Sequence, residues 1–404
     1  MNILFLSTAN PIPPIDGHCI RTFNILKFLS RYHKIFFIAI ARSSKELDYK
    51  DQLYDYCESV DIFINPINKS KLRFIISIIK NLFSSLPFMI QKYYHREISH
   101  KIKNVLEKHK IDIVHFDTLH LATYYNDVKK TPKVLTNHNA ESSRLLTWIK
   151  IERNILIKLF LYYQYFKLKS FEQKMHPKFE ECIVVSEDDK KVLLSNYKNN
   201  KNNISVIPNG VDIDYFRPSE NSTKKNNLLW IGDMENPYSK DAVVFFIEKI
   251  LPLIKPNIPD INVTFIGIHP PDQLIRASMR NANIKVLGFV DDVRPYMQEC
   301  SIFIVPLRGG GGTKLKVLNS MALAKPVVTT SIGVEGIEVT PDENIVVADN
   351  PDEFADKIIY LLSNPDIAKN MGRKAREIVK KYYDWEVIGR KMNSLYNEIS
   401  NLRS

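Results

Sequence analysis

Short apolar runs of strand length recur along this chain of 404 residues, and longer amphipathic stretches separate them. Runs of about four to eight apolar residues that alternate with helix-length segments are typical of parallel strands covered by helices on both faces. The alternation therefore predicts an α/β fold built from open, doubly wound parallel sheets. The strands predicted in the first half are 3–6, 35–39, 62–64, 111–115, 134–136, 183–185 and 204–207.

A polar, turn-rich segment interrupts this pattern at 208–227, and the alternation then restarts. Such a composition is typical of an interdomain linker, and the chain is too long for one comfortable core. We therefore expect a first domain over 1–207, a second over 228–384, and a last helix over 385–404 that packs back on the first domain. The second domain is predicted to contain strands 228–231, 263–266, 302–305 and 327–329 and helices 241–253, 314–323 and 352–362.

The net charge of +11 lies entirely in the first half of the chain. Residues 1–200 carry 31 Lys and Arg against 20 Asp and Glu, whereas residues 201–404 carry 25 of each. Within 69–110, ten basic side chains are accompanied by only Glu97 and Glu107. The excess indicates either solvated helix faces or a surface for an anionic partner, such as a membrane or a lipid phosphate. No nucleic-acid-binding motif accompanies the charge, so we expect no nucleic-acid partner.

Two segments of the first half, 71–94 and 144–174, combine apolar clusters with basic side chains. Interfacial helices have this composition, because they place an apolar face in lipid and basic groups at the head groups. The alternative is that the aromatic side chains pack inside the protein. The aromatic residues of the second segment are Trp148, Phe160, Tyr162, Tyr163, Tyr165 and Phe166.

Cysteine usage and the N-terminal residues bear on the compartment. The four cysteines lie far apart and form no Cys-x-x-Cys pair, which argues against a zinc site or a disulfide framework and fits a reducing compartment. The first residues indicate a buried strand rather than a signal peptide, and no apolar run approaches the roughly 20 residues that span a bilayer. We expect a cytoplasmic protein, or one peripheral on the inner face of the cell membrane.

Four consecutive glycines stand between a predicted buried strand and a predicted helix that opens near Thr313. Glycines let backbone amides approach a bound group closely, and a helix start supplies unpaired N–H groups and partial positive charge. The pattern therefore predicts an anion site for phosphate oxygens, although glycine-rich loops also occur as plain connectors. It is not a Walker loop. The predicted site comprises Arg308, Gly309, Gly310, Gly311, Gly312, Thr313, Lys314 and Lys316.

A second loop follows the first predicted strand and contains Gly17 at the turn into a helix. In an open α/β sheet such a turn lies on the edge that faces a ligand. Arg21 follows one helical turn later and is expected to point at the same edge. Taken alone, this loop is weak support for a site.

Several motifs follow one another in order through both halves of the chain. They are Pro-Pro-x-x-Gly-x-x-x-Arg at 13–21, His-Asn-Ala-Glu at 138–141, Val-Ile-Pro-Asn-Gly-Val-Asp at 206–212, Gly-Phe-Val-Asp-Asp-Val-Arg-Pro-Tyr at 288–296 and the glycine loop. With these motifs the chain resembles glycosyltransferase family 4, the retaining enzymes of the GT-B architecture. The resemblance implies two Rossmann-like domains that face each other across a cleft, with the nucleotide sugar on the second and the acceptor on the first.

The resemblance also assigns residues to roles. The glycine loop through Thr313 would hold the diphosphate, Gly232 would form the facing loop, and Phe289 and Val290 would lie by the nucleobase. Gly17 would close on the donor. His138 and Glu141 match the family's catalytic motif near the transferred sugar, although a histidine after a strand also serves as a plain helix cap. Enzymes of this type need no metal and no cofactor beyond the UDP- or GDP-linked co-substrate.

The chain departs from the family pattern at several donor positions. Much of the family carries two glutamates eight residues apart in the donor loop, and these positions fall here at Gly311 and Asn319. Asparagine can bond hydroxyl groups, but it lacks the two strong acceptors of a carboxylate. The Gly-Arg…Lys pair that grips the diphosphate is also imperfect, because Asp233 follows Gly232 and Lys240 is a loose match.

Three functions remain open at this point. The first is sugar transfer from a nucleotide donor to a saccharide or lipid-linked acceptor, in cell-surface polysaccharide or glycoconjugate synthesis. The second is a catalytically degenerate GT-B protein that binds another glycosyltransferase, which Asn319 and Asp233 make credible. The third and weakest is a sugar-nucleotide 2-epimerase, which shares the double-Rossmann layout but not this series of loops.

Overall fold

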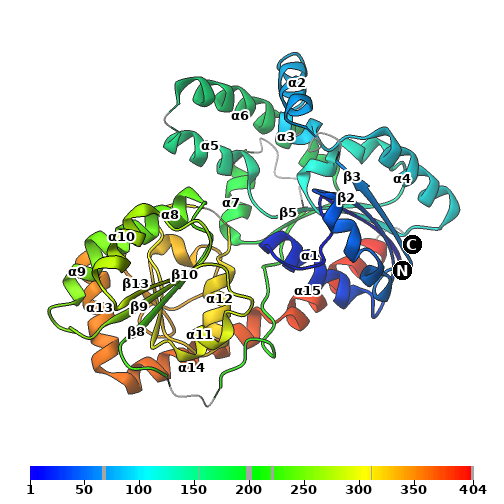
Figure 1. The fold of residues 1–404 in the computed structure, drawn as a ribbon. Coiled ribbons are helices and arrows are strands. Elements are labelled where there is room, and N and C mark those ends of the chain that lie inside the picture. Colours follow the sequence, from blue (N-terminus) through cyan, green and yellow to red (C-terminus); the bar gives the residue numbers. More distant parts are fainter. Residues whose placement is uncertain (66–69, 153, 197–202, 220–222, 311, 402–404) are drawn as a thin grey trace. The chain divides into compact units, whose positions relative to one another are not determined.

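The chain divides into two compact units in the computed structural model (Figure 1). The first unit contains residues 1–208 together with 388–404, and the second contains residues 209–387. The predicted linker from residue 209 onward is grouped with the second unit. The structure describes residues 1–65, 70–152, 154–196, 203–219, 223–310 and 312–401.

A seven-stranded parallel sheet forms the centre of the first unit, in the order β3-β2-β1-β4-β5-β6-β7. The central strand β1 pairs on both sides, so that Leu4 lies opposite Phe36 on one neighbour and Val114 on the other. All three side chains are buried, as expected of a sheet covered on both faces. The strands are β1 Asn2–Ser7, β2 Lys34–Ala41, β3 Ser59–Ile64, β4 Ile113–Phe116, β5 Lys133–Asn137, β6 Glu181–Val184 and β7 Ile204–Val206.

The helices of the first unit begin at recognisable caps. The Asp16 carboxylate accepts a hydrogen bond from the backbone N–H of Cys19 at 2.9 Å, and the Asn154 side chain caps the first turn of a long helix. The α-helices are α1 Gly17–Leu29, α2 Lys71–Leu82, α3 Phe88–Gln91, α4 Arg96–Lys108, α5 Glu141–Ile151, α6 Ile155–Met175, α7 Glu187–Asn196 and, from residue 388 onward, α15 Trp385–Asn401. No helix among the described residues is both long and apolar enough to cross a bilayer.

Residues of α15 pack directly on the sheet of the first unit. The buried Tyr396 hydroxyl lies 2.6 Å from Nδ1 of His115, a buried residue of β4. His33, just before β2, lies 2.6 Å from the Asn393 side-chain oxygen. The last helix of the chain therefore completes the core that the first residues of the chain begin.

The second unit is built around a six-stranded parallel sheet in the order β10-β9-β8-β11-β12-β13. Trp230, Phe265 and Phe303 fill its core and are fully buried. The strands are β8 Asn227–Ile231, β9 Asn262–Ile266, β10 Ile284–Leu287, β11 Ile302–Val305, β12 Val327–Thr329 and β13 Val346–Val347. The α-helices are α8 Pro237–Phe245, α9 Leu251–Ile254, α10 Asp272–Arg280, α11 Arg294–Glu299, α12 Leu315–Ala322, α13 Pro351–Ser363 and α14 Pro365–Tyr382.

The predicted strands are all present, with ends shifted by a few residues, and the α/β class is confirmed. The structure adds the edge strands β10 and β13, which were not predicted. The predicted helix 241–253 is α8 and α9 joined by a π-helical turn over Phe246–Ile250. Pro252 has no N–H to donate to the preceding turn, which accounts for the change in winding just before it.

Candidate functional site

Each sheet has one point where the strand order reverses, and some of the predicted site residues lie at these two points. In the first unit the reversal lies between β1 and β4, and in the second it lies between β8 and β11. Loops that leave the carboxyl ends of two such strands diverge, so the crevice between them is the usual place for a ligand in an open α/β sheet.

The glycine loop leaves the carboxyl end of β11 and leads into α12. Gly310 has φ +112° and Gly312 has φ +73°, conformations that L side chains rarely adopt. Gly309 lies against the ring of Tyr238, and Gly311 lies outside the described residues. The helix begins at Leu315, one residue later than the predicted range 314–323. The loop therefore places several backbone N–H groups at the crevice by the start of α12.

Lys316 is on the first turn of α12, directly after the glycine loop, and its side chain reaches the loop that leaves β8. A Cβ atom built on Gly232 would lie 2.7 Å from the Lys316 Nζ and 2.9 Å from the Trp230 ring, so the glycine lies directly against both side chains. The Nζ also lies 4.8 Å from the centroid of the Trp230 ring. Burial, and to a smaller extent the charge of Lys314, lowers the pKa of Lys316 to about 8.

Two polar side chains beside the glycine loop lack protein partners. Among the described residues, no carboxylate forms an ion pair with Lys316, and the buried Thr313 hydroxyl has no hydrogen-bond partner. Buried polar groups without partners are uncommon in folded proteins and often mark a missing ligand. Asn319 follows Lys316 by three residues on α12 and therefore lies on the same side of the helix.

The remaining predicted donor residues lie in different surroundings. Lys314 folds back, with its Nζ donating to the Gly312 carbonyl at 2.6 Å. The Arg308 guanidinium is bound by Asp241 at 2.6 Å, so this charge is already compensated. Phe289 is exposed just after β10, and Val290 packs partly against the core. These two residues lie at the same edge of the sheet as Gly232, because every strand of the sheet is parallel.

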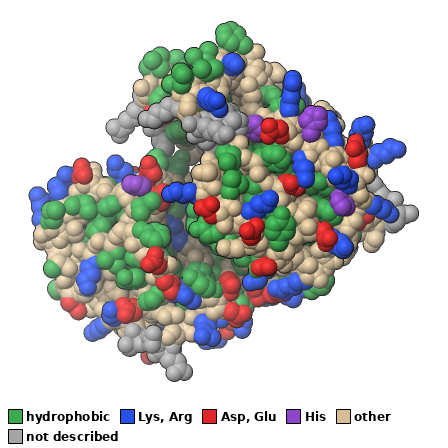
Figure 2. Space-filling model, turned by 45° about the vertical axis from the view of Figure 1, so that its right-hand side comes forward, with side chains coloured by type: hydrophobic (Ala, Val, Ile, Leu, Met, Phe, Trp, Pro, Cys, Tyr) green, Lys and Arg blue, Asp and Glu red, His purple; other side chains and the backbone are tan. Residues whose placement is uncertain are grey.

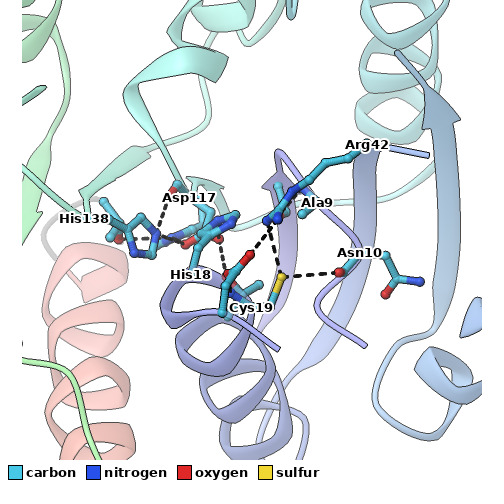
Figure 3. Close-up of polar contacts among 12 residues, drawn as sticks. Ala9, Asn10, His18, Cys19, Arg42, Asp117 and His138 are labelled. Carbon is cyan, nitrogen blue, oxygen red and sulfur yellow. Dashed lines mark hydrogen bonds and ion pairs between the residues drawn. The ribbon is translucent and has the colours of Figure 1, made fainter. Parts of the chain in front are cut away.

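A buried carboxylate, Asp117, organises the crevice of the first unit (Figure 3). It follows β4 directly, and its Oδ2 accepts hydrogen bonds from His18 Nε2 at 3.0 Å and from the Thr22 hydroxyl at 2.5 Å. His138 Nε2, from the loop after β5, lies 3.2 Å from Asp117 Oδ1 and 2.8 Å from the Asp117 backbone oxygen. Three segments of the chain therefore meet at one side chain.

Burial, nearby charges and hydrogen bonds determine the protonation states of Asp117 and His138. Burial alone would raise the pKa of Asp117, but the nearby His138 and the hydrogen bonds from His115, His138 and His18 hold it well below its usual range. Burial lowers the pKa of His138 despite the opposing effect of Asp117. A neutral His138 that donates its Nε2 proton to Asp117 keeps Nδ1 as an acceptor for a hydroxyl group.

Asp117 was missed in the sequence, although it carries a recognisable signal. It directly follows the buried strand Ile113–Phe116, and its position at the end of that strand places it on the ligand edge. Gly17, which was predicted, is the first residue of α1 and immediately precedes His18. Glu141 begins α5 and is bound by Arg144 at 2.9 Å, rather than by His138.

The expectation that Arg21 faces the ligand edge is corrected by the structure. Its side chain is fully buried, and its guanidinium donates to the backbone oxygens of Ile207 at 2.8 Å and Pro208 at 2.6 Å. Arg21 therefore ties α1 to the end of the first unit. The long side chain reaches inward because the α1 face that carries it packs on the sheet.

We expect Arg21→Met to lower the free energy of unfolding by about 3 kcal/mol, because two buried carbonyl groups lose charged donors. Urea unfolding followed by circular dichroism measures the change. Lys27→Met, at an exposed position of the same helix, serves as the control and should shift the midpoint little. Equal effects of the two substitutions would contradict the structural role of Arg21.

Some of these side chains also have the geometry to hold a metal ion. His18, Asp117 and His138 offer ligand atoms that lie within 4.8 Å of one another, and so do the exposed Asp233, Glu235 and His269. Two histidines and one carboxylate are a common ligand set for zinc. In the first group, however, the hydrogen bonds described above already join the three side chains. The first group therefore has a stable arrangement as a polar cluster.

Sequence models of two families match the chain over most of its length. The model described as Glycosyltransferase Family 4 matches residues 27–215, and the model described as Glycosyl transferases group 1 matches residues 225–364. The first match covers the loops of the Asp117 cluster from β4 onward. The second covers both loops of the Lys316 crevice.

Two curated relatives extend this similarity. An uncharacterized 44.6 kDa protein in the cps region of Klebsiella pneumoniae is 23% identical over 398 residues, which are 95% of this chain and 96% of that protein. A GDP-mannose-dependent monoacylated alpha-(1-6)-phosphatidylinositol monomannoside mannosyltransferase of Corynebacterium glutamicum is 24% identical over 212 residues, 47% of this chain and 55% of the relative.

Solved structures share the fold over the whole chain. Sucrose-phosphate synthase from Thermosynechococcus elongatus superimposes with a TM-score of 0.73 at 15% identity, covering 100% of both chains. The Anabaena protein HepE in complex with UDP superimposes with a TM-score of 0.66 at 14% identity, covering 98% of this chain and 100% of that one. At these identities the likeness concerns the fold alone, which is that of two Rossmann-like domains.

Proposed function

We propose that this chain, which belongs to glycosyltransferase family 4 and has the GT-B fold, transfers a sugar from a nucleotide-sugar donor to a saccharide or lipid-linked acceptor. Its being a glycosyltransferase follows from the two family matches. The donor class, the stereochemistry and the biological role are inferences. The observation that carries the donor class is the unpaired, partly buried ammonium group of Lys316 beside the glycine loop.

The second unit is the proposed donor-binding half. A diphosphate carries about two negative charges at neutral pH, and a helix N-terminus with adjacent cations is a suitable site for it. The N–H groups of the glycine loop, the Thr313 hydroxyl and Lys316 would bind its oxygens. These groups would also stabilise the charge that develops on the leaving diphosphate, so no metal is needed for that purpose.

Asn319 and the residues after β10 would bind the nucleoside. Asn319 would contact a ribose hydroxyl from the face of α12 that carries Lys316, in place of the family glutamate. The exposed Phe289 offers a flat surface for the base. UDP and GDP both remain candidates, because HepE was solved with UDP and the Corynebacterium relative uses GDP-mannose.

The first unit is the proposed acceptor and catalytic half. His138, held by Asp117, would accept a hydrogen bond from a hydroxyl of the transferred sugar through Nδ1. We infer retention of the anomeric configuration, as in the family that the chain belongs to. The cps region in which the Klebsiella relative occurs supports a role in cell-surface polysaccharide synthesis.

The function is tested with a panel of UDP- and GDP-linked sugars. Thermal shift and calorimetric titration identify the donor, and product analysis with saccharide and lipid-linked acceptors identifies transfer and its stereochemistry. We expect one base to bind, and we expect transfer to continue in the presence of EDTA. Absence of binding by every nucleotide and nucleotide sugar would overturn the proposal and favour a degenerate, partner-binding protein.

Donor binding should weaken above pH 8. Lys316 is protonated below its pKa of about 8 and loses its charge above it, whereas a bound diphosphate favours the protonated form. The affinity should therefore be constant from pH 6.5 to 7.5 and fall as the pH rises through 8 to 9, with proton uptake on binding near pH 8. Calorimetry in two buffers of different ionisation enthalpy measures this uptake.

The Lys316→Arg variant provides the control for this pH dependence. Arginine keeps its charge at every pH used, so its affinity should stay nearly flat between pH 7 and 9. If the variant and the parent protein lose affinity in parallel, another group is responsible.

A further inference from the structure

The helix α2 carries its apolar stripe on the side that faces solvent. Leu72, Ile75, Ile79 and Phe83 follow one another at helical spacing, and all are exposed, with Phe83 at 90%. Asn81, on the opposite side of the helix, is fully buried. A surface helix of a globular protein normally turns its apolar stripe toward the core. In α2 the usual arrangement is reversed.

The helix α6 is also apolar on its outer face. Its inner face is buried in the first unit and comprises Leu161, Gln164, Leu168, Glu172 and Met175. Its outer face lies on the opposite side at about 100° per residue and comprises Ile155, Leu159, Tyr162, Tyr163 and Phe166. Leu159 is 60% exposed and Phe166 is 66% exposed. The aromatic side chains of this segment therefore do not all pack internally, which was the alternative left open by the sequence.

Hydrogen bonds around Asn81 join α2 to α6. The Asn81 side chain donates to Gln91 Oε1 at 2.5 Å and accepts from Gln164 Nε2 at 2.9 Å, and its backbone oxygen accepts from Lys167 Nζ at 2.7 Å. The Tyr163 hydroxyl donates to the Leu82 backbone oxygen at 2.7 Å. These hydrogen bonds join α2 to α6 in the first unit. We call two exposed faces together the apolar platform: the stripe of α2 through Phe83 and the outer face of α6.

The charges around the apolar platform are basic. Segment 70–94 contains no acidic residue, and the one acidic residue of α6, Glu172, is buried on the inner face. Arg73 and Lys80 are exposed and lie along one side of the α2 stripe, while Lys158 and Lys174 lie on either side of the α6 outer face. Figure 2 shows hydrophobic side chains gathered over α2 with Lys and Arg among them. In Figure 1, α6 lies next to the end of α2, to which it is hydrogen-bonded.

We propose that the apolar platform docks on a lipid bilayer that contains anionic lipids. Exposed aliphatic and aromatic side chains flanked by basic groups match the two layers of such a surface, acyl chains below and negatively charged head groups above. Large exposed apolar patches are rare on proteins that act free in solution. The absence of exposed acidic groups favours a negatively charged lipid surface over a protein partner, whose rim would carry charges of both signs.

Sedimentation of the full chain with vesicles tests this docking, and it needs neither donor nor acceptor. We expect binding to vesicles of phosphatidylcholine with 30% phosphatidylglycerol. Binding should weaken in phosphatidylcholine alone and at high salt. Ile79→Glu with Phe83→Glu should lower the partition coefficient at least about tenfold, because apolar surface is lost and negative charge is added. Arg73→Ala and Lys80→Ala should each lower it roughly fivefold.

Matched variants of the second unit serve as controls. Met279→Glu replaces an exposed apolar residue and Lys249→Ala an exposed lysine, and neither should change vesicle binding. Equal binding of the parent protein and the Ile79→Glu, Phe83→Glu variant would overturn the proposal. So would a concentration-dependent dimer in analytical ultracentrifugation that this variant abolishes, because the platform would then bind a second copy of the chain.

Discussion

Lys316→Ala is expected to lower kcat/KM for the sugar-nucleotide donor by about 100-fold, because it removes a desolvated cation from the proposed diphosphate site. The Lys316 Nζ lies in the space left by Gly232, against the Trp230 ring, without a carboxylate partner among the described residues. A charge held in this way loses hydration in the free protein, which its lowered pKa reflects. Contacts with a bound diphosphate would offset this lost hydration. Removal of the lysine should therefore affect the donor-bound state most.

Two further variants serve as controls for this measurement. Lys316→Arg should recover a substantial part of the activity, because the charge is restored although its shape differs. Lys249→Ala, at an exposed position of the same unit, should leave kcat/KM unchanged. Thermal unfolding should show that Lys316→Ala is no less stable than the parent, since an unpaired buried charge has been removed. Unchanged kcat/KM in Lys316→Ala would refute the proposed donor site.

The fold could be predicted because burial on both faces leaves a clear trace in the sequence. Runs such as Ile3–Leu6 and Ile302–Val305 are continuously apolar, since their strands have neighbours on both sides and helices above and below. The edge strand β10 was missed because only one of its sides is paired and Lys285 is exposed within it. With only two residues, β13 is too short to produce any pattern.

The glycine loop could be recognised because its features are local, but contacts between distant segments could not. The place of the Lys316 Nζ beside Gly232 depends on how the tertiary fold brings the start of α12 to the loop after β8, which no spacing along the chain encodes. The Asp117 cluster joins residues about 20 and 100 positions away from it. The prediction that Arg21 points at the ligand edge was wrong. An arginine near a ligand loop is equally able to bind backbone carbonyls inside the protein, as Arg21 does.

Asp117→Asn is expected to lower kcat by about 1,000-fold while the KM for the donor changes little. Asparagine fits the same space, but it carries no charge, and its amide group presents N–H donors where His18 and Thr22 now donate. His138 would lose the partner that fixes its tautomer and ring orientation. The loss of an orienting aspartate behind a histidine has large effects in other enzymes, of the order of 10,000-fold.

A positioning role for Asp117 makes further predictions that a purely structural role does not. His138→Ala should lower kcat to a similar extent, and the double variant Asp117→Asn, His138→Ala should be hardly worse than either, because the two residues act as one unit. NMR titration should show a lower pKa for His138 in Asp117→Asn, since the carboxylate raises it in the parent protein. Glu58→Gln, at an exposed carboxylate of the first unit, is the control. Additive losses in the double variant would mean that Asp117 acts independently of His138, through the stability of the crevice rather than through the histidine.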